Sequence, residues 1–314
     1  MTRISTVIVT WNQAELTIDC LRALDAAGMQ PANTWLVDNG SSPDVLPAIR
    51  ARFPRIQTLR LDVNRGFAGG CNAGASAALE SGTDYIFLLN NDALVTPETL
   101  PALLEAIERD SRVAAVSPKV YYDTAGKVIQ SVGLAVDPAS GQARMLGANQ
   151  PDHGQYDQVA ERDALFGCAL LIRRAAWQQV GPFWEPFFNY AEETDWCLRA
   201  RELGWRLLYV GGAAVRHRTS SSLGWDSPLK VYLITRNQLY LRQRHRPAGW
   251  RAWRGLTYAL YVGARAWARY MRRGQRPQAR ALWLAWWDYA RDRTGDRRTN
   301  DLRLKEINRY DSAR

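Results

Sequence analysis

Two kinds of segment alternate along the first 115 residues. Short apolar runs rich in β-branched, Leu and aromatic residues predict strands at residues 5–11, 35–39, 56–62 and 85–90. The segments between them carry Leu, Ile or Ala at spacings of three and four, and predict helices at 15–28, 44–53, 72–82 and 97–110. Such alternation is typical of βαβ units, so we expect an α/β fold with a parallel sheet covered on both faces.

The second half of the chain is less regular. Gly, Asp and Pro separate strand-like runs at 113–122 and 128–136, which indicates hairpins and loops. Further on, the pattern predicts strands at 166–174 and 206–210, and helices at 175–181 and 191–205, the last of them ended by Gly204.

Polar clusters follow three of the predicted strands. The stretches "TWN", "DNGSS" and "NND" begin at Thr10, Asp38 and Asn90. Each alone is ordinary turn chemistry, and Thr96 with Pro97 would make a good helix start after the last one. In a parallel sheet, however, the carboxyl ends of the strands meet at one edge, where ligands bind. We therefore expect these clusters to form a binding site.

The charge is unevenly distributed. Of 41 Lys and Arg and 31 Asp and Glu, residues 228–314 hold 21 and 6, so residues 1–227 are mildly acidic. This split predicts one domain at 1–227 and a basic, aromatic-rich helical extension at 228–314.

Cysteine usage and hydropathy indicate an intracellular protein. The four Cys are widely spaced, which argues against a disulfide scaffold and a thiolate zinc site and favours a reducing cytoplasm. The chain opens on a strand-like segment without the apolar stretch of a signal peptide. It holds no run of about eighteen apolar residues, so we expect no spanning helix.

The first strand is not followed by a dinucleotide-binding GxGxxG motif. A nucleotide could still lie there, with Asp38 accepting hydrogen bonds from base or ribose, although Asp38 could equally cap its own turn. The stretch "NRGFAGGCNAG" (64–74) places four Gly before a helix, and glycines there serve either phosphate binding or close packing. Arg65 could hold a diphosphate or face solvent.

Asp92 and His217 are candidate metal ligands. A diphosphate needs its charge neutralised, usually by Mg²⁺ or Mn²⁺ held by one or two carboxylates. His217 follows a strand and is one of three His in the chain. An isolated His is more often structural, unless it converges with Asp92, where an imidazole would favour Mn²⁺ over Ca²⁺.

The stretch "NYAEETDWCLRA" (189–200) is the densest acidic cluster. Glu192, Glu193 and Asp195 stand at a predicted helix start, where the helix dipole favours carboxylates. Asp195 and Arg199 could simply form an i,i+4 pair on a solvated face. Alternatively, the flanking aromatic residues create a partly dry environment that raises the proton affinity of a general base.

Seven stretches in order resemble the motif series of family 2 glycosyltransferases, in particular the bacterial rhamnosyltransferase-like branch. They span residues 4–225: "VIVTWN", "VDNGSS", "NRGFAGGCNAG", "LLNNDALVTP", "FGCALLIRR", "NYAEETDWCLRARELGWR" and "VRHRTSSS". The resemblance implies a GT-A fold, a Rossmann-like mixed sheet. It also implies inverting transfer of a sugar from a nucleoside diphosphate sugar to an acceptor hydroxyl. Residues 1–227 would then be the catalytic domain, with the nucleotide-sugar half at about 1–115 and the acceptor half at about 116–227.

The resemblance also assigns roles to residues. Asp92, in the position of a DXD-like motif, and His217 would bind Mg²⁺ or Mn²⁺. Glu193 would be the base, although the family's Glu-Asp-x-Asp reads Glu192-Glu193-Thr194-Asp195 here, which leaves Glu192 and Asp195 open. The residues expected to bind the nucleotide sugar are Thr10, Asn12, Asp38, Asn39, Arg65, Gly66, Asn72, Asn91 and Asp92.

The basic extension suggests where the enzyme works. Arg265, Arg269, Arg272 and Arg276 fall on one helical face, apart from Leu256, Leu260, Gly263, Trp267 and Tyr270, with Pro277 ending the helix. The segment 281–293 is densely aromatic. We expect this extension to bind anionic lipid, ahead of simple packing on the core and of nucleic-acid binding.

The resemblance therefore predicts a peripheral enzyme at the inner face of the cytoplasmic membrane. It would move a sugar, with dTDP-rhamnose as the leading donor, to a lipid-linked glycan in surface polysaccharide synthesis. The alternatives are a nucleotidyltransferase and a non-catalytic sugar-nucleotide-binding partner. Against a nucleotidyltransferase, the N-terminal region has no clear Gly-rich activation loop. Against a non-catalytic partner, the chain carries an acidic cluster and His217, which such a protein does not need.

Overall fold

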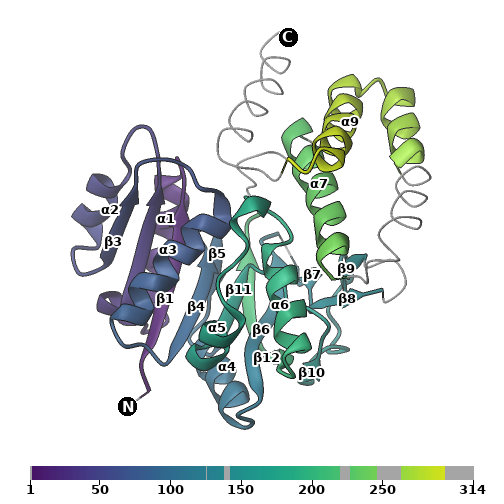
Figure 1. Cartoon of the computed structure of the whole chain (residues 1–314). Helices are drawn as coiled ribbons and strands as arrows, with labels where there is room; N and C mark the ends of the chain where they lie inside the picture. Colours follow the sequence, from purple (N-terminus) through teal and green to yellow (C-terminus); the bar gives the residue numbers. More distant parts are fainter. Residues whose placement is uncertain (1, 125, 138–141, 220–226, 246–262, 294–314) are drawn as a thin grey trace. The chain divides into compact units, whose positions relative to one another are not determined.

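The computed structural model describes residues 2–124, 126–137, 142–219, 227–245 and 263–293 (Figure 1). The chain divides into two compact units. The first, which we call the sheet unit, comprises Met1–Val136, Ala143–Glu185 and Glu192–Thr219. The second, the helical unit, comprises Asp137–Gln142, Pro186–Ala191 and Ser220–Arg314.

A ten-stranded sheet forms the centre of the sheet unit, as far as the described residues go. Its main path runs β10 (Ala160–Glu161), β12 (Arg206–His217), β6 (Val113–Tyr122), β11 (Ala169–Arg173), β4 (Tyr85–Asn90), β1 (Ile4–Thr10), β2 (Thr34–Asn39) and β3 (Gln57–Leu61). Off this path, β5 (Ala93–Val95) pairs with β12, and β7 (Ile129–Ser131) pairs with β6. A separate two-stranded sheet joins β8 (Leu134–Val136) to β9 (Ala143–Met145).

The sheet is mixed. Strands β4, β1, β2 and β3 are parallel neighbours, as the alternating pattern predicts. Strand β11 then lies antiparallel between β4 and β6, and β12 pairs with β6 in parallel. The carboxyl ends of β1, β2 and β4 therefore share one edge.

Helices cover both faces of this sheet. On one face, α1 (Ala14–Ala26), α2 (Leu46–Arg52) and α4 (Thr99–Glu108) share a core with Ile8. On the other, α3 (Gly66–Glu80), α5 (Arg174–Val180) and α6 (Glu192–Glu202) share a core with Val7 and Val9. Successive β1 residues thus point into opposite cores, which explains why the strand is apolar throughout. Short 3₁₀ turns occur at η1 (Pro31–Asn33) and η2 (Glu185–Phe187).

The largest departure from the predicted helix starts is at α3, whereas α2 and α4 each begin two residues later than predicted. Helix α3 starts at Gly66 rather than near residue 72, so the glycine-rich stretch is helical. An added Cβ at Gly70 or Gly74 would lie 2.6 and 2.4 Å from the Cγ1 atoms of Val9 and Val7. These two glycines therefore let α3 approach β1 closely. Helix α4 starts at Thr99, because the backbone still pairs through β5 as far as Val95.

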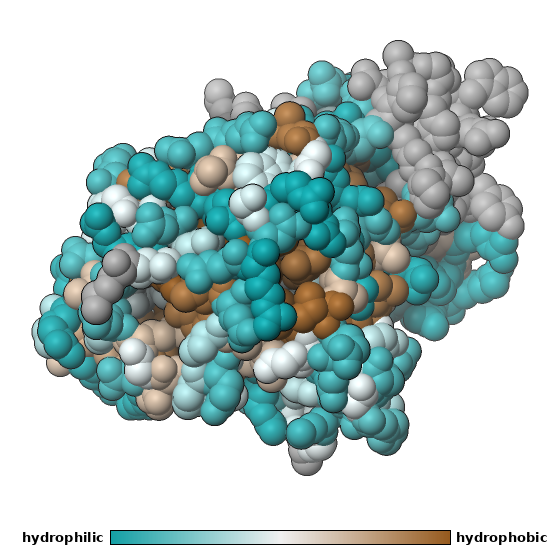
Figure 2. Space-filling model, turned by 90° about the horizontal axis from the view of Figure 1, so that it is seen from below, coloured by the Kyte–Doolittle hydropathy of each residue, from teal (hydrophilic) through white to brown (hydrophobic). Residues whose placement is uncertain are grey.

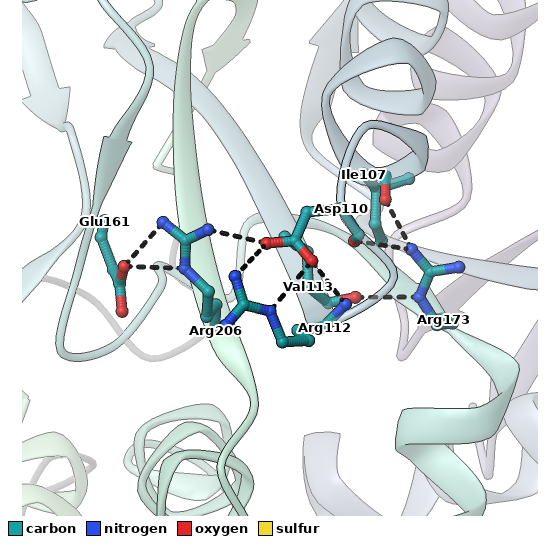
Figure 3. A network of polar contacts seen from close by, with 7 residues as sticks. All are labelled: Ile107, Asp110, Arg112, Val113, Glu161, Arg173 and Arg206. Atoms are coloured by element: carbon teal, nitrogen blue, oxygen red, sulfur yellow. Dashed lines mark hydrogen bonds and ion pairs between the residues drawn. The ribbon is translucent and has the colours of Figure 1, made fainter.

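An ion-pair network holds the opposite end of the sheet (Figure 3). The Asp110 carboxylate accepts from Arg112 at 3.1 Å and from Arg206 at 2.8 Å, and Arg206 also pairs with Glu161. These guanidinium groups lower the pKa of Asp110 below its usual range. Arg173 donates to the Val113 carbonyl at 2.9 Å. The network holds together the amino ends of β6 and β12. His217 lies at the opposite, carboxyl end of β12.

The helical unit contains α7 (Pro228–Arg244), a helix at 263–272 and α9 (Arg276–Ala290). Ser227 caps α7 by accepting from the Lys230 N–H. Buried residues of α7 and α9 form one core: Leu229, Tyr232, Leu233, Ala281 and Ala285.

The described part of the extension differs in one detail from the predicted pattern. Arg265, Arg269 and Arg272 are exposed on the helix at 263–272. That helix ends near Gly274 (φ 69°), and Pro277 lies in the first turn of α9 instead of ending a helix. Leu256 and Leu260 lie outside the described residues.

The surface is predominantly hydrophilic on the face that Figure 2 shows, with hydrophobic residues gathered near its centre. None of the helices in the described ranges has both the length and the apolar composition that crossing a bilayer requires. The four Cys are free and buried.

Candidate functional site

Strand pairing brings the polar clusters together at one edge of the sheet. Thr10 of β1 lies opposite Asp38 of β2, and Val9 lies opposite Asn90 of β4. All three polar side chains stand at the carboxyl ends of parallel strands, where the pattern predicted a ligand site.

The candidate nucleoside residues hold each other in place. The Thr10 hydroxyl accepts from Thr17, and the Asp38 carboxylate accepts from the Ser41 N–H at 3.0 Å. Asp38 is fully buried and pairs with Arg60. Asn12, at a φ of 57°, bonds to Ser41 and Ser42 through its backbone N–H and its side-chain oxygen, respectively. Asp38 therefore caps its own turn, which is one of the two roles that the sequence allowed. The other role, binding a nucleotide, is not excluded by this contact.

Asn39 organises the start of α3. Its side-chain amide donates to the Gly66 carbonyl at 2.9 Å and to Asn64, and its oxygen accepts from the Arg65 N–H. Gly66 has a φ of 74°, a conformation that glycine adopts without strain. The end of β2 is therefore fastened to the glycine-rich entry of α3.

Arg65 and Asn72 both contact Glu185 of η2. The Arg65 guanidinium lies 2.7 Å from the Glu185 carboxylate, with both side chains about 40% exposed. Asn72 donates to the Phe183 carbonyl at 2.9 Å and to Glu185 at 3.3 Å. These contacts join the glycine-rich helix to the chain segment that precedes the acidic cluster.

Asp92 and His217 converge, although 125 positions separate them in the sequence. Antiparallel pairing of β5 with β12 places Ala93 opposite His217, and the His217 Nε2 lies 3.0 Å from an Asp92 oxygen. Both side chains are at most 10% exposed. Asn91 turns away from this pair and donates to Gln13 and Thr17 of the α1 region.

Neighbouring amides orient the imidazole. The His217 Nδ1 lies 2.9 Å from the Gln130 oxygen, an acceptor, so this nitrogen carries a proton. The Asn90 amide nitrogen lies 3.3 Å from Nε2 and donates to it in this tautomer, so Nε2 faces Asp92 as an acceptor. In addition, the buried Asn90 Oδ1 has no hydrogen-bond partner among the described residues. A cluster of oxygen and nitrogen acceptors of this kind suits a divalent cation.

Two protein ligands do not make a complete metal cage. Within the described ranges, no group of three or more His, Cys, Asp or Glu side chains is arranged to hold an ion. Mg²⁺ and Mn²⁺ often take one or two protein ligands and complete their shell with phosphate oxygens and water. The pair Asp92 and His217 fits this second mode.

The acidic cluster contains two carboxylic acids with raised proton affinity. Burial and the neighbouring Glu193 charge raise the pKa of Glu192 well above its ordinary value. Burial also raises the pKa of Glu193 to about 7, although the N–H groups of Glu193, Thr194 and Gly167 favour its charged form. Glu193 is only half-buried, whereas Glu192 is 2% exposed and its Oε2 has no partner among the described residues.

Asp195 has a different environment. It is fully buried, and its carboxylate accepts from the Arg199 Nε at 2.9 Å. Arg199 in turn donates to the Pro182 carbonyl at 2.9 Å. The i,i+4 pair expected from the sequence therefore forms, but in the interior rather than on a solvated face.

Residues 166–168 connect the two chemical groups. The Phe166 ring meets the His217 ring edge-on at 6.0 Å between centroids. Gly167 lies against Glu193 and donates its N–H to that side chain. The Cys168 carbonyl accepts from the Asn90 N–H at 2.9 Å. Three successive residues thus bring the Asp92–His217 pair and the Glu192–Glu193 pair into one neighbourhood.

Sequence reasoning missed three residues of this site. Gln130 lies in an irregular stretch and carries no motif of its own. Gly167 lies within the stretch "FGCALLIRR", but only the structure shows that a side chain there would meet Glu193 at 3.2 Å. Glu185 precedes the acidic cluster, and only its contact with Arg65 in the structure identifies it as part of the candidate site.

Two sequence comparisons bear on this arrangement. The sequence profile of glycosyl transferase family 2 matches residues 5–179. An N-acetylglucosaminyl-diphospho-decaprenol L-rhamnosyltransferase of Mycobacterium tuberculosis is 29% identical over 79% of this chain and 85% of its own length. A low-salt glycan biosynthesis hexosyltransferase of Haloferax volcanii, Agl10, is 25% identical over 56% of each chain.

Solved structures share the fold at low sequence identity. A mannosyltransferase of Pyrobaculum calidifontis, crystallised with GDP-mannose and Mn²⁺, aligns with a TM-score of 0.55 over 92% of this chain and 87% of its own, at 13% identity. GalNAc-T7, crystallised with UDP, GalNAc and Mn²⁺, aligns with a TM-score of 0.58 over 77% of this chain and 48% of its own, at 16% identity. The fold is therefore the GT-A glycosyltransferase fold. With the motifs in order and the family profile covering more than half of it, the chain belongs to glycosyl transferase family 2 and is a glycosyltransferase.

Proposed function

We propose that this enzyme transfers rhamnose, with inversion at the anomeric carbon, from a nucleoside diphosphate sugar to a hydroxyl of a lipid-linked glycan. The observation that carries the proposal is the segment 166–168, which contacts both the Asp92–His217 pair and the Glu192–Glu193 pair. A transferase of this kind needs a group that stabilises the leaving diphosphate and a base for the acceptor, close together.

The donor side uses the edge of the sheet. Asp92 and His217 would hold Mg²⁺ or Mn²⁺, which would neutralise the charge that develops on the departing diphosphate. Thr10, Asn12, Asp38 and Asn39 would line the nucleoside side, and the Asn91 amide would support the turn. Arg65, Gly66 and Asn72 would lie toward the diphosphate, at the amino end of α3, where N–H groups favour anions.

Glu193 is the proposed base. Its carboxylate removes the proton of the acceptor hydroxyl while that oxygen bonds to the anomeric carbon, and the electron pair of the breaking bond leaves with the nucleoside diphosphate. A pKa of about 7 suits a base at neutral pH. Asp195 is committed to Arg199, and Glu192 is almost completely buried, which supports Glu193 over both.

The substrates are inferred from the relatives. The M. tuberculosis relative is named for L-rhamnose transfer to N-acetylglucosaminyl-diphospho-decaprenol. We therefore infer dTDP-rhamnose as donor and a polyprenyl-diphosphate-linked sugar as acceptor, in surface polysaccharide synthesis. An acceptor of this kind would place the enzyme in the cytoplasm, at the inner face of the membrane.

The test is nucleoside diphosphate release from a panel of sugar nucleotides, with and without EDTA and with a polyprenyl-diphospho-N-acetylglucosamine acceptor. We expect release from dTDP-rhamnose that requires metal and is lost in Asp92→Ala and Glu193→Gln. Glu161→Gln, at the far end of the sheet, is the matched acid-to-amide control and should retain activity. Full activity of Glu193→Gln would exclude Glu193 as the base.

We propose that one face of α9 contacts the membrane surface. Arg276, Arg280, Trp283 and Trp287 recur at helical spacing, and all four are exposed, Trp283 by 62%. Cationic and aromatic side chains on one face suit the headgroup region of an anionic bilayer. In the full chain, Trp283→Ser with Trp287→Ser should reduce sedimentation with phosphatidylglycerol vesicles. Unchanged sedimentation of the double variant would contradict this assignment.

A further inference from the structure

The segment 186–191, directly before the acidic cluster, has an unusual backbone. Phe188, Tyr190 and Ala191 have φ angles of 66°, 72° and 78°. Residues other than glycine rarely adopt this left-handed conformation, and three of them within four positions require outside support. The peptide bond after Ala191 leads into Glu192, the first residue of α6.

Helix α7 provides this support through two buried polar residues. The Asn237 amide donates to the carbonyls of Phe187, Asn189 and Tyr190 at 2.8, 2.8 and 2.7 Å. The Arg236 guanidinium donates to the carbonyls of Pro186 and Phe187 at 2.9 and 3.1 Å. Both side chains are 0% exposed.

The two residues also hold each other. Arg236 donates from Nε and Nη2 to the Asn237 oxygen at 3.1 and 3.0 Å, which leaves the Asn237 amide facing the segment. Phe188 and Tyr190 pack on the core of α7 and α9, and Lys230 lies over the Tyr190 ring at 5.9 Å. Burying a guanidinium costs free energy unless its N–H groups are hydrogen-bonded, and here they are spent on the backbone carbonyls of the segment and on Asn237.

We propose that Arg236 and Asn237 are positioning residues, which fix the segment 186–191 and thereby set the position of Glu192 and Glu193 at the start of α6. The consequence for catalysis rests on the proposed function.

The environment of Glu193 makes it sensitive to such a change. Glu192 and Cys197 lie beside it on α6, and Cys71 of α3 also senses its charge. The N–H groups of Gly167 and Thr194 donate to it. If the segment loosens, we expect water to reach Glu193 and the position of its carboxylate to become less defined.

The first measurement is hydrogen exchange of peptides covering 186–195. Asn237→Asp loses the donors but retains the oxygen that accepts from Arg236, and Arg236→Lys is a second, milder variant. Ser227→Ala is the control, because it removes a hydrogen bond of α7, the N-cap bond from the Lys230 N–H (3.2 Å), and leaves Arg236 and Asn237 in place. We expect faster exchange at 186–195 in the first two variants only.

The second measurement is the pH dependence of transfer from dTDP-rhamnose. We expect kcat of Asn237→Asp to fall by about 100-fold with KM for the donor unchanged, and the acidic limb of its profile to move to lower pH. Equal exchange and equal kcat in Asn237→Asp and Ser227→Ala would overturn the proposal. A wild type without turnover would refute the proposed function instead, and the exchange comparison would still decide the role of the two residues.

Discussion

The Glu193 side chain combines a catalytic advantage with a cost in stability. Its pKa is about 7 in the folded protein and near 4.5 when exposed. Between these values the unfolded state releases a proton that the folded state retains, so the free energy of unfolding falls as pH rises. The full cost, about 3 kcal/mol, is present above pH 7 and absent below about pH 4.5.

Glu193→Gln should therefore stabilise the protein at alkaline pH while abolishing transfer. We expect a higher melting temperature than wild type at pH 8 and no difference near pH 4, measured by calorimetry at both values. A gain that is equal at the two pH values would contradict a raised Glu193 pKa.

Gly167 offers a second test at the residue scale. A Cβ at this position would lie 3.2 to 3.4 Å from the Glu193 side chain, which is tighter than ordinary contact. Gly167→Ala should displace the carboxylate and reduce kcat by about tenfold, with donor binding measured by calorimetry unchanged. Gly212→Ala is the control, since its added Cβ meets nothing within 4 Å. Similar kcat values for the two variants would argue against a positioning role for Gly167.

At the scale of elements, α3 approaches the sheet closely on the donor side. Gly74→Ala would place a Cβ 2.4 Å from Val7 and 2.9 Å from Val37, so α3 must move. We expect a loss of about 1–3 kcal/mol in urea denaturation. Ser76→Ala, exposed on the same helix, should change stability little. A neutral Gly74→Ala would mean that α3 can shift without cost.

Sequence patterns predicted the elements of residues 5–110 well, because apolar strands and amphipathic helices alternate there without long insertions. They failed at the start of α3, since four glycines normally argue against a helix and only close packing on β1 favours them here. Pro277 was placed wrongly for a related reason: proline suits the first turn of a helix as well as the residue after one. The strand β12 extends through two glycines to His217, which its composition did not indicate.

The site itself was predicted in part. The residues that carry charge at strand ends could be found from spacing, and Asp92 and His217 do converge. The contacts of Gln130, Gly167, Arg236 and Asn237 could not be found, because they depend on pairing between segments far apart in the sequence. An amide or a glycine has no chemical signature until its neighbours are known.

For the whole molecule, the uneven charge has a measurable consequence. With residues 228–314 holding 21 basic and 6 acidic side chains, binding to anionic vesicles should be largely electrostatic. We expect the bound fraction to fall severalfold between low salt and about 1 M NaCl, where the Debye length is about 3 Å. Neutral vesicles should bind little protein at either salt concentration. Binding that is independent of salt and lipid charge would indicate that the basic extension does not bind lipid electrostatically.

The pairing of β5 with β12 also constrains how the protein is made. Asn90 and His217 are 127 positions apart, and β12 reaches its place only beside β6, beyond the inserted β11. Contacts of such long range form late, because a long loop must first close. During synthesis, the first 115 residues can therefore fold their strands but cannot bring His217 beside Asp92. If Asp92 and His217 bind the donor as proposed, donor binding should begin only once nearly all of the sheet unit has left the ribosome.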